Sequence, residues 1–488
     1  MAFINFPNCQ QKIRLMKKIL FLLITASIAL ASCDKDFGDL NVDKKRPSAV
    51  PPGALFTTAQ KNMTDLMTSP NVNSNIFRYI SQYWTETTYI DEVNYDLPGR
   101  NIPQNFWNII YVNVLKNLKE AQGLIPDQND AFFPPTVKAN ENACIEIMNV
   151  YAFSTLVNTF GNIPYTEALD FANALPKYDD AATVYDDLLN RLDNAISSID
   201  DGAGGFGSSD ILYGGDMAGW KKFGKSLQAR LAMVIADSDP DKASSIISKV
   251  ANEIITNNDD NVIFQYLSAP PNTNPVWENL IQSGRKDDIA ANTIVDIMNG
   301  LGDPRASYYF TTDANGAFSG GIYGENNNFA TYSKPNDRIT AADYESILFD
   351  AAEGNFLLAE AVERGFISGS ADTYYTAGIQ ASCDYWNADA IAYLIKPEVA
   401  YATAQGDWKQ KIGTQKWLAL YNRGFEAWTE WRRLDYPALV APAQAISDIP
   451  RRFTYPVQEQ TLNATNYTAA AAAVGGDVVE TKLFWDKF

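Results

Sequence analysis

The chain has 488 residues, of which 46% are hydrophobic and 12% aromatic, as is typical of a folded globular protein. Its formal net charge of −19 at pH 7 argues against nucleic acid as a partner, because phosphate binding relies on dense Lys and Arg. The chain contains no histidine, which excludes Ser-His-Asp, Cys-His and zinc hydrolase mechanisms and confines any catalysis mainly to paired carboxylates.

The N-terminal segment has the features of a secretory signal. The charged start Met16-Lys17-Lys18 precedes an apolar run from Ile19 to Leu30. This run is too short to cross a bilayer, because a spanning helix takes about 20 residues. We predict a signal peptide over residues 1–32, with Met16 as an alternative start.

Leu30-Ala31-Ser32-Cys33 matches a bacterial lipobox, in which the peptidase cuts before the cysteine and lipid is attached to it. The alternative is ordinary cleavage near Ser32 with a chance cysteine. We predict lipidation of Cys33. An extended tether should follow over residues 33–53. This stretch contains three prolines, and its second part shows no hydrophobic periodicity.

Beyond the tether the apolar residues mostly recur at the spacing of an α-helix, and the alternating pattern of a strand is rare. We predict an all-α, or mainly α, single domain over residues 54–488. Helical spacing is found over 54–68, 74–84, 105–121, 139–160, 181–199, 217–236, 241–256, 342–364, 371–386 and 407–434.

The helix predicted over 139–160 carries apolar residues around most of its circumference, which predicts burial on most sides. Gly161 should follow it in a left-handed conformation, and Pro164 should direct the chain into a new helix from Thr166. Gly365 should likewise adopt a left-handed conformation after the helix over 342–364. Asp239 and Pro240 are expected to be the N-cap and first residue of the helix predicted over 241–256.

Residues 261–337 are rich in Pro and Gly, which predicts a long, loop-rich insertion. Such long loops are usually functional or disordered, and the interspersed aromatic residues argue against disorder. A short Ala-rich tract near the C-terminus, from Thr468 to Val474, favours no structure on its own.

Three local patterns have a structural interpretation that we prefer to a functional one. Residues 219–226 match the P-loop pattern, but Trp220 and Phe223 keep helical spacing through it, so we expect packing and no nucleotide site. The acidic triplet at 237–241 opens like a calcium loop, but the Gly and Glu that such a loop needs are missing, so no metal is expected. Arg432, Arg433, Arg451 and Arg452 are expected to pair with carboxylates rather than to contact a ligand.

Two cysteines remain in the mature domain, Cys144 and Cys383. Each lies in a helical pattern among apolar neighbours, which favours buried free thiols. A disulfide between the two helices is the alternative in an oxidising compartment.

Several stretches together resemble one protein family, and they occur in family order along nearly the whole chain. They are FGNIPYTEAL, PKYDDAATVYDDLLNRLDNAI, DMAGWKKFGKSLQARLAM, DPRASYYF, FLLAEAVERGF, YYTAGIQASCDYW, KIGTQKWLALYNRGFEAWTEWRRLDYP and IPRRFTYP. In this order they resemble the SusD/RagB family of outer-membrane nutrient-binding lipoproteins. The resemblance implies tetratricopeptide-like helix pairs, although the sequence itself has no clean repeat.

The resemblance also implies a function. It predicts a non-catalytic protein, without a cofactor, that captures an oligosaccharide or polysaccharide and passes it to a SusC-like TonB-dependent outer-membrane transporter. The acidic residues after Cys33 resemble the export tag of Bacteroidetes surface lipoproteins. They imply a lipid-anchored protein on the outer membrane, facing the cell exterior.

A glycan site requires aromatic planes for the C–H face of a sugar, flanked by polar groups that meet its hydroxyls. Two regions offer this mixture, the early loop from Trp84 to Trp107, which the family uses for ligand contacts, and the insertion. The candidate ligand-binding residues are Trp84, Tyr89, Asp91, Asn94, Tyr95, Arg100, Trp277, Tyr323 and Asn327.

Two other function classes remain open at this stage. One is a helical-repeat surface protein that binds peptides or protein partners. The other is a surface glycosidase that uses two of the 58 Asp and Glu residues, although no pair of acids stands out in the sequence.

Overall fold

The structure is a computed structural model that describes Arg14, residues 16–20 and residues 50–488. The predicted cleavage site, Cys33 and most of the predicted tether lie outside these residues. Pro51–Phe488 forms one compact unit. Among the described residues, none of the helices has the length and apolar character needed to cross a membrane.

The first half of the unit is helical, as the hydrophobic period predicts. Its helices are α3 (Pro52–Thr68), α4 (Phe77–Ile80), η1 (Pro98–Arg100), α5 (Ile102–Asn108), η2 (Ile109–Leu115), α6 (Lys116–Leu124), η3 (Ile125–Asp127), α7 (Pro135–Phe160), α8 (Ala181–Ser198), η4 (Gly207–Ser209), α9 (Met217–Val234) and α10 (Pro240–Val250).

The second half contains shorter helices before the long ones resume. They are η5 (Asn258–Asp260), α11 (Pro275–Trp277), η6 (Glu278–Gln282), α12 (Asn292–Leu301), α13 (Ala306–Tyr309), α14 (Ala351–Glu363), α15 (Ala371–Trp386), α16 (Ile391–Leu394), α17 (Trp408–Ala419), α18 (Gly424–Leu434), α19 (Val457–Leu462) and α20 (Ala464–Ala473). The Ala-rich tract is thus part of a helix.

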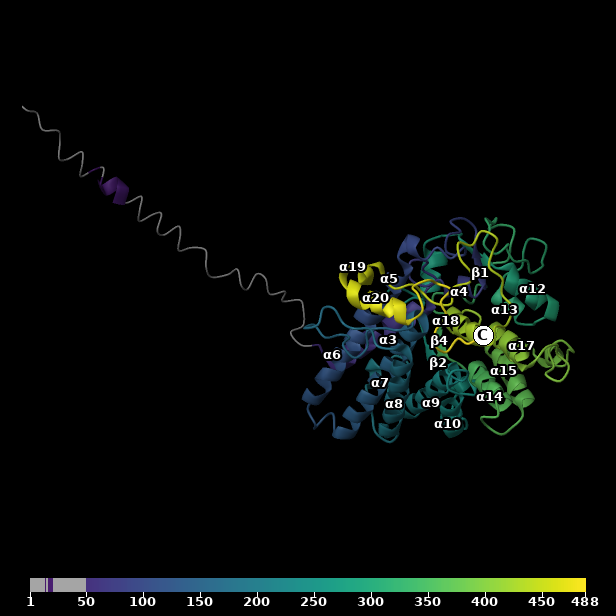
Figure 1. Cartoon of the computed structure of the whole chain (residues 1–488), viewed down its shortest axis with the longest axis horizontal. Coiled ribbons are helices and arrows are strands. Elements are labelled where there is room, and N and C mark those ends of the chain that lie inside the picture. Colours follow the sequence, from purple (N-terminus) through teal and green to yellow (C-terminus); the bar gives the residue numbers. More distant parts are fainter. Residues whose placement is uncertain (1–13, 15, 21–49) are drawn as a thin grey trace, which may run out of the picture. The chain divides into compact units, whose positions relative to one another are not determined.

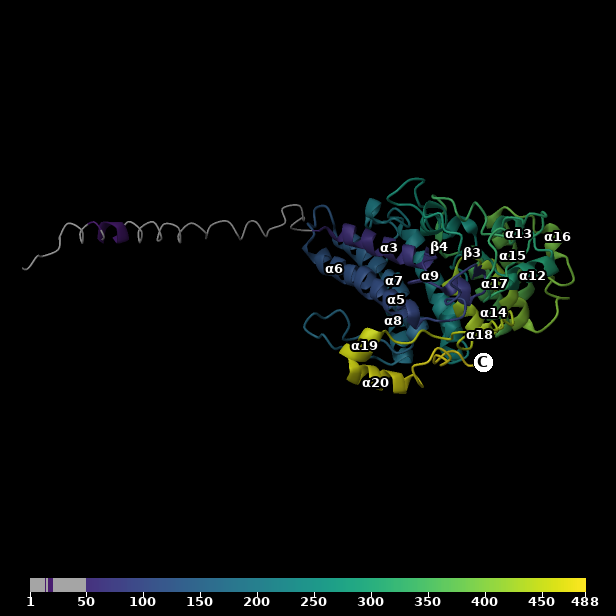
Figure 2. The same ribbon diagram turned by 90° about the horizontal axis from the view of Figure 1, so that it is seen from above.

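Helices that follow one another in the chain pack against each other, as α7 does with α8, α8 with α9, and α14 with α15. Figure 1 shows α7, α8, α9 and α10 along one side of the unit, with β1 on the opposite side. α19 and α20 lie at the other end of the unit from α12 in both views (Figure 1 and Figure 2). The mainly α class is confirmed.

α7 is the central buried helix of the first half. It is buried through most of its length from Asn140 to Phe160, while Asn142 and Glu146 stay half-buried. It ends at Gly161, whose φ of +85° is the positive value predicted for this position. Two further terminal predictions are confirmed: Gly365 has a φ of +72°, and the Asp239 side chain accepts a hydrogen bond from the Lys242 N–H at 3.1 Å.

Two antiparallel pairs of short strands join distant parts of the chain. β1 (Trp84–Glu86) pairs with β3 (Asp288–Ala290), and β2 (Val262–Phe264) pairs with β4 (Ser346–Phe349). The first pair matters most for function, because it joins the early loop to the insertion.

The helix predicted over 74–84 is therefore too long at both ends, since α4 begins only at Phe77. Helix α4 stops at Ile80, because Gln82 adopts a φ of +56° and turns the chain into β1. Trp84 and Thr85 then take the extended geometry that aromatic and β-branched residues favour.

Three more boundaries differ from prediction for local reasons. No helix begins at Thr166, because the Asp179 carboxylate accepts the N–H groups of Tyr165 and Thr166 and holds a turn there. The helix over 342–364 starts only at Ala351, after β4, where the Asp350 side chain caps it. The helix over 407–434 is two helices, separated near Asn422, whose φ is +70°.

The 261–337 insertion is not the structureless loop that its Pro and Gly content predicts. It contains β2, α11, η6, β3, α12 and α13. The strands β2 and β3 are three residues each and pair with distant residues, as β3 does with β1, so no local period marks them in the sequence.

The packing role predicted for residues 219–226 and the buried free cysteines are confirmed in the described part of the chain, whereas Arg432 does not pair with a carboxylate as predicted. Residues 219–226 lie inside α9, where a Cβ on Gly224 would meet Ile196 Cγ1 at 2.7 Å, so this glycine serves close packing. Cys144 and Cys383 are free and buried. The four arginines bind internal groups: Arg433 pairs with Glu360, Arg451 with Asp486, Arg452 with Asp477, and Arg432 donates to the carbonyls of Asn158 and Arg451.

Candidate functional site

A cleft of about 320 Å³ lies where the early loop meets the insertion. One wall carries Glu86, Tyr89 and Arg100 from β1 and the residues that follow it. The other carries Asn279 of η6 and the segment Arg285–Asp288, which leads into β3. The β1–β3 pairing holds the walls together, with Glu86 and Asp288 as register partners.

Tyr89 is the aromatic residue that this cleft offers to a ligand. Its side chain is 72% exposed, and its backbone has a φ of +57°. Few non-glycine residues adopt this left-handed conformation, and such residues often occur at functional sites. The ring therefore has an open face beside a polar cleft, which is the combination that a pyranose requires.

Charged side chains surround this ring. The Arg100 guanidinium pairs with Glu92, whose side chain is fully buried, so that Arg100 is fixed at the edge of the cleft. Arg285 Nη1 lies 4.0 Å from Asp287 Oδ2 on the opposite wall. Tyr79 donates its hydroxyl to Asp288 Oδ1 below them.

Two carboxylic acids in the cleft have strongly shifted pKa values. Burial, with the nearby Asp288 charge as a second cause, raises the pKa of Glu86 to about 9. Burial likewise raises the pKa of Asp288 to about 6, although the hydrogen bond from Tyr79 opposes this shift. The cleft therefore contains one acid that is protonated at neutral pH and one that is mostly ionised.

The structure brings two of the nine predicted site residues, Tyr89 and Arg100, into this cleft. Asp91 is exposed on the same loop, and Trp277 is half-buried at the end of α11, two residues before Asn279.

The other five predicted site residues make internal contacts. Trp84, Asn94, Tyr95 and Tyr323 are buried, and Tyr323 donates its hydroxyl to the Tyr79 carbonyl at 2.8 Å. The half-buried Asn327 donates its amide to the Glu86 carbonyl at 3.1 Å, which ties the insertion to β1. In this conformation these side chains support the cleft from behind.

The sequence-based prediction missed the acids and the remaining polar lining of the cleft: Tyr79, Glu86, Thr88, Asn279, Arg285, Asp287 and Asp288. One signal was available, since the charged run Arg285–Asp288 comes directly before an apolar Ile-Ala-Ala segment in the middle of the insertion. Its pairing with β1 is a long-range contact that no local pattern indicates.

A larger surface groove of about 710 Å³ lies along η2 and α6. Its lining includes Val112, Leu124, Leu169 and the exposed Phe171, with Lys116 Nζ 5.3 Å from the centre of the Phe171 ring. Charged groups occur there, but the surface between them is apolar. This groove suits a hydroxyl-rich ligand less well than the cleft does.

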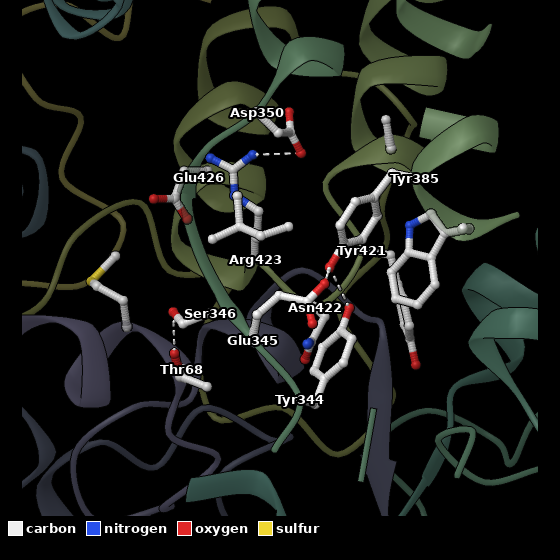
Figure 3. A pocket seen from close by; sticks show the side chains of 14 residues that line it. Thr68, Tyr344, Glu345, Ser346, Asp350, Tyr385, Tyr421, Asn422, Arg423 and Glu426 are labelled. Atoms are coloured by element: carbon white, nitrogen blue, oxygen red, sulfur yellow. Dashed lines mark hydrogen bonds and ion pairs between the residues drawn. The ribbon is translucent and has the colours of Figure 1, made fainter. Parts of the chain in front are cut away.

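A third pocket lies inside the unit and is shown in Figure 3. Tyr344 and Tyr385 meet there through their hydroxyls at 3.0 Å, Arg423 Nη1 lies 3.1 Å from Asp350 Oδ2, and Thr68 bonds to Ser346. Its volume is about 30 Å³, which is enough for a water molecule or two but not for a sugar ring. We assign it a structural role.

Comparison with known proteins agrees with the fold. A family model described as "Starch-binding associating with outer membrane" matches residues 44–456. No curated protein sequence matches the chain.

Several solved structures share the fold. A chitin-binding protein has a TM-score of 0.76 at 24% identity, with 90% of this chain and 100% of that chain covered. A SusD homologue from Bacteroides thetaiotaomicron has a TM-score of 0.75 at 24% identity and the same coverage. A chitin-binding SusD homologue from Flavobacterium johnsoniae has a TM-score of 0.72 at 25% identity, with 90% and 97% covered. Since the family model spans most of its length, this chain belongs to the SusD-like family.

Proposed function

We propose that this protein is a non-catalytic glycan-binding lipoprotein of the outer membrane, anchored through Cys33 and facing the cell exterior. It captures an oligosaccharide or polysaccharide at the cleft between the early loop and the insertion. It then delivers the glycan to a SusC-like TonB-dependent transporter.

The exposed ring of Tyr89 beside the polar cleft is the observation that carries this proposal. A sugar ring stacked on Tyr89 would place its hydroxyls near Arg100, Asn279 and Asp287, which together supply hydrogen-bond donors and acceptors. Two of the structural relatives are described as chitin-binding, which makes β-linked N-acetylglucosamine oligomers the first ligands to test.

Calorimetry with the purified mature protein tests the binding function. We expect saturable binding of at least one glycan from a panel of chitin, starch and plant cell-wall oligosaccharides, without hydrolysis of the ligand. Binding of peptides by a protein that binds none of these glycans would overturn the proposal and favour a peptide-binding surface protein.

Delivery to a transporter requires a contact surface of standard size, about 1,200 Å² or more. Co-purification of the native protein from outer membranes tests this part separately. We expect a TonB-dependent transporter as a stoichiometric partner, and a protein that is consistently isolated alone would contradict delivery.

The Glu86–Asp288 pair favours one second candidate, a carboxylate-based glycosidase. Retaining glycosidases place two carboxyl groups about 5 to 5.5 Å apart, and opposite residues of an antiparallel pair have their Cβ atoms at a similar spacing. However, both side chains are almost fully buried at the base of the cleft, which limits access of a glycosidic bond. Analysis of the products after prolonged incubation of the protein with a glycan distinguishes the two functions. Hydrolysis of the glycan by wild type, abolished in Glu86→Gln, would establish an enzyme.

A further inference from the structure

Two carboxylates face each other across the β1–β3 pair. Glu86 and Asp288 are directly opposite in register, and the neighbouring Thr87 N–H donates to the Asp287 carbonyl at 2.8 Å. This pattern makes Glu86 and Asp288 a non-hydrogen-bonded pair, in which side chains come closest together. Ionising both acids at such positions would destabilise the sheet. Because of burial and this repulsion, Glu86 holds a proton at neutral pH while Asp288 is mostly ionised.

Neither acid has a close cationic partner within residues 50–488. Glu86 is only 3% exposed, and its one hydrogen bond is a long contact of 3.4 Å from the Val93 N–H to Oε2, which leaves Oε1 without a protein partner. Asp288 is 4% exposed and accepts only the Tyr79 hydroxyl, at Oδ1. Both residues line the base of the cleft, where a small group that projects from a bound sugar ring can reach their remaining acceptor positions although a glycosidic bond cannot.

The cations around this pair bind other groups. Arg100 pairs with Glu92, and Arg285 lies nearest to Asp287. Arg78 lies behind Asp288, but its N–H groups donate to Asn422 and to the carbonyls of Ser69 and Thr68. Tyr79 contributes a neutral donor, and the exposed Asp91 adds a further negative charge on the loop. Glu86 and Asp288 are thus acids of the cleft to which the described residues supply no paired counter-ion.

A ligand that satisfies such a pair must bring positive charge and hydrogen-bond donors. The described residues contain no cluster of three or more side chains suited to holding a metal, so Glu86 and Asp288 alone would leave most of the ligand positions of a divalent cation to water. An ammonium group has three donors and no acceptor, and its charge-assisted hydrogen bonds are stronger than those of a neutral hydroxyl. An ammonium group therefore matches the pair better than a metal or an uncharged sugar.

We infer that the cleft selects glycans carrying a protonated primary amine, that is, an amino sugar unit such as a de-N-acetylated glucosamine residue. The ammonium group lies between Glu86 and Asp288, and the sugar ring lies against Tyr89. This inference rests on the proposed glycan-binding function and specifies its ligand class.

Calorimetry at pH 6 compares glucosamine oligomers with N-acetylglucosamine oligomers of equal length. We expect wild type to bind the amine-bearing oligomer about tenfold more tightly or better, because hydrogen bonds between charged groups are stronger than those of a neutral amide. The ratio of the two affinities should fall towards one in Glu86→Gln and in Asp288→Asn, both of which keep the side-chain shape. A matched control, Asp372→Asn, removes one carboxylate from α15 and should retain the wild-type ratio.

A second readout does not depend on comparing ligands. Because Glu86 holds a proton in the empty cleft, an ammonium group that ionises it must release that proton to the buffer. The calorimetric heat in wild type should therefore vary with the ionisation enthalpy of the buffer. This dependence should be smaller in Glu86→Gln, where only the partly protonated Asp288 still releases a proton, and absent in the Glu86→Gln, Asp288→Asn double variant.

The outcomes separate the inference from the function on which it rests. If wild type binds the acetylated oligomer as tightly as the amine-bearing one, or more tightly, the amine preference is wrong while glycan binding stands. If wild type binds neither these oligomers nor any other glycan, the proposed function fails first. A preference that persists unchanged in the Glu86→Gln, Asp288→Asn double variant, with folding verified by circular dichroism, would also overturn the inference.

Discussion

The indole Nε1 of Trp84 donates a hydrogen bond of 2.9 Å to the hydroxyl of Tyr421. The Arg78 guanidinium lies 5.1 Å from the centre of the same indole ring, and the Trp84 side chain is fully buried. The ring therefore links β1 to the residues between α17 and α18, and it supports the cleft without facing it.

Trp84→Ala should destabilise the protein by about 3 to 5 kcal/mol, because it opens a large cavity and leaves the Tyr421 hydroxyl without its donor. Urea unfolding measures this effect. Tyr89→Ala is the matched control, since replacing this exposed ring should change stability by about 0.5 kcal/mol or less. If Trp84→Ala kept full stability but lost glycan affinity, the ring would be a ligand contact after all.

Glu86 should make stability depend on pH. Its pKa is about 9 in the folded protein, so between its ordinary value and about pH 9 the folded state holds a proton that the unfolded state has released. The contribution of Glu86 to the free energy of unfolding therefore falls as the pH rises through that window, by up to about 1.4 kcal/mol per pH unit.

Glu86→Gln removes this dependence, so the variant should gain Tm relative to wild type as the pH is raised from 5 to 8.5. Thermal unfolding of both proteins at several pH values measures the difference. The other titrating groups are the same in both proteins, so their effects cancel in the Tm difference. A constant Tm difference across this range would show that Glu86 titrates normally.

The P-loop-like segment should contribute to stability rather than to ligand binding. Trp220 is fully buried and donates to Asp210 Oδ2 at 2.7 Å, so Trp220→Ala should cost about 3 to 5 kcal/mol. Lys225 pairs with the exposed side chain of Glu253, and Lys225→Ala should cost about 1 kcal/mol or less and leave glycan affinity unchanged. Protection of Lys225 from chemical modification by ATP would contradict this assignment.

Membrane attachment should depend on Cys33. Cys33→Ala should release the mature protein into the soluble fraction, because it removes the proposed site of lipid attachment and the apolar run before it is too short for a stable span. Fractionation after an alkaline wash measures the release, with Cys144→Ala as a control that keeps Cys33. A Cys33→Ala protein that still pellets with membranes would exclude a lipoprotein.

The sequence predicts the long helices well, because α7, α8, α9 and α15 each carry a continuous apolar face that determines their burial. It predicts the cleft only in part. Tyr89 and Arg100 line the cleft as predicted, whereas Trp84, Tyr95 and Tyr323 are equally aromatic but buried. Trp84 bonds to Tyr421, and the Tyr323 hydroxyl bonds to the Tyr79 carbonyl of α4 and to the Tyr95 hydroxyl. Glu86 and Asp288 lie about 200 residues apart in sequence, and only the β1–β3 register brings them together.

Glycan capture at the cleft is the central claim, and the dissociation constants of wild type and Tyr89→Ala for the tightest-binding glycan test it most directly. Phe171→Ala is the matched control, because Phe171 is an equally exposed ring that lines the separate apolar groove. We expect affinity to fall about tenfold or more in Tyr89→Ala, which corresponds to about 1.4 kcal/mol, with no change in Phe171→Ala. Unchanged affinity in Tyr89→Ala, or an equal loss in both variants, would contradict glycan binding at this cleft.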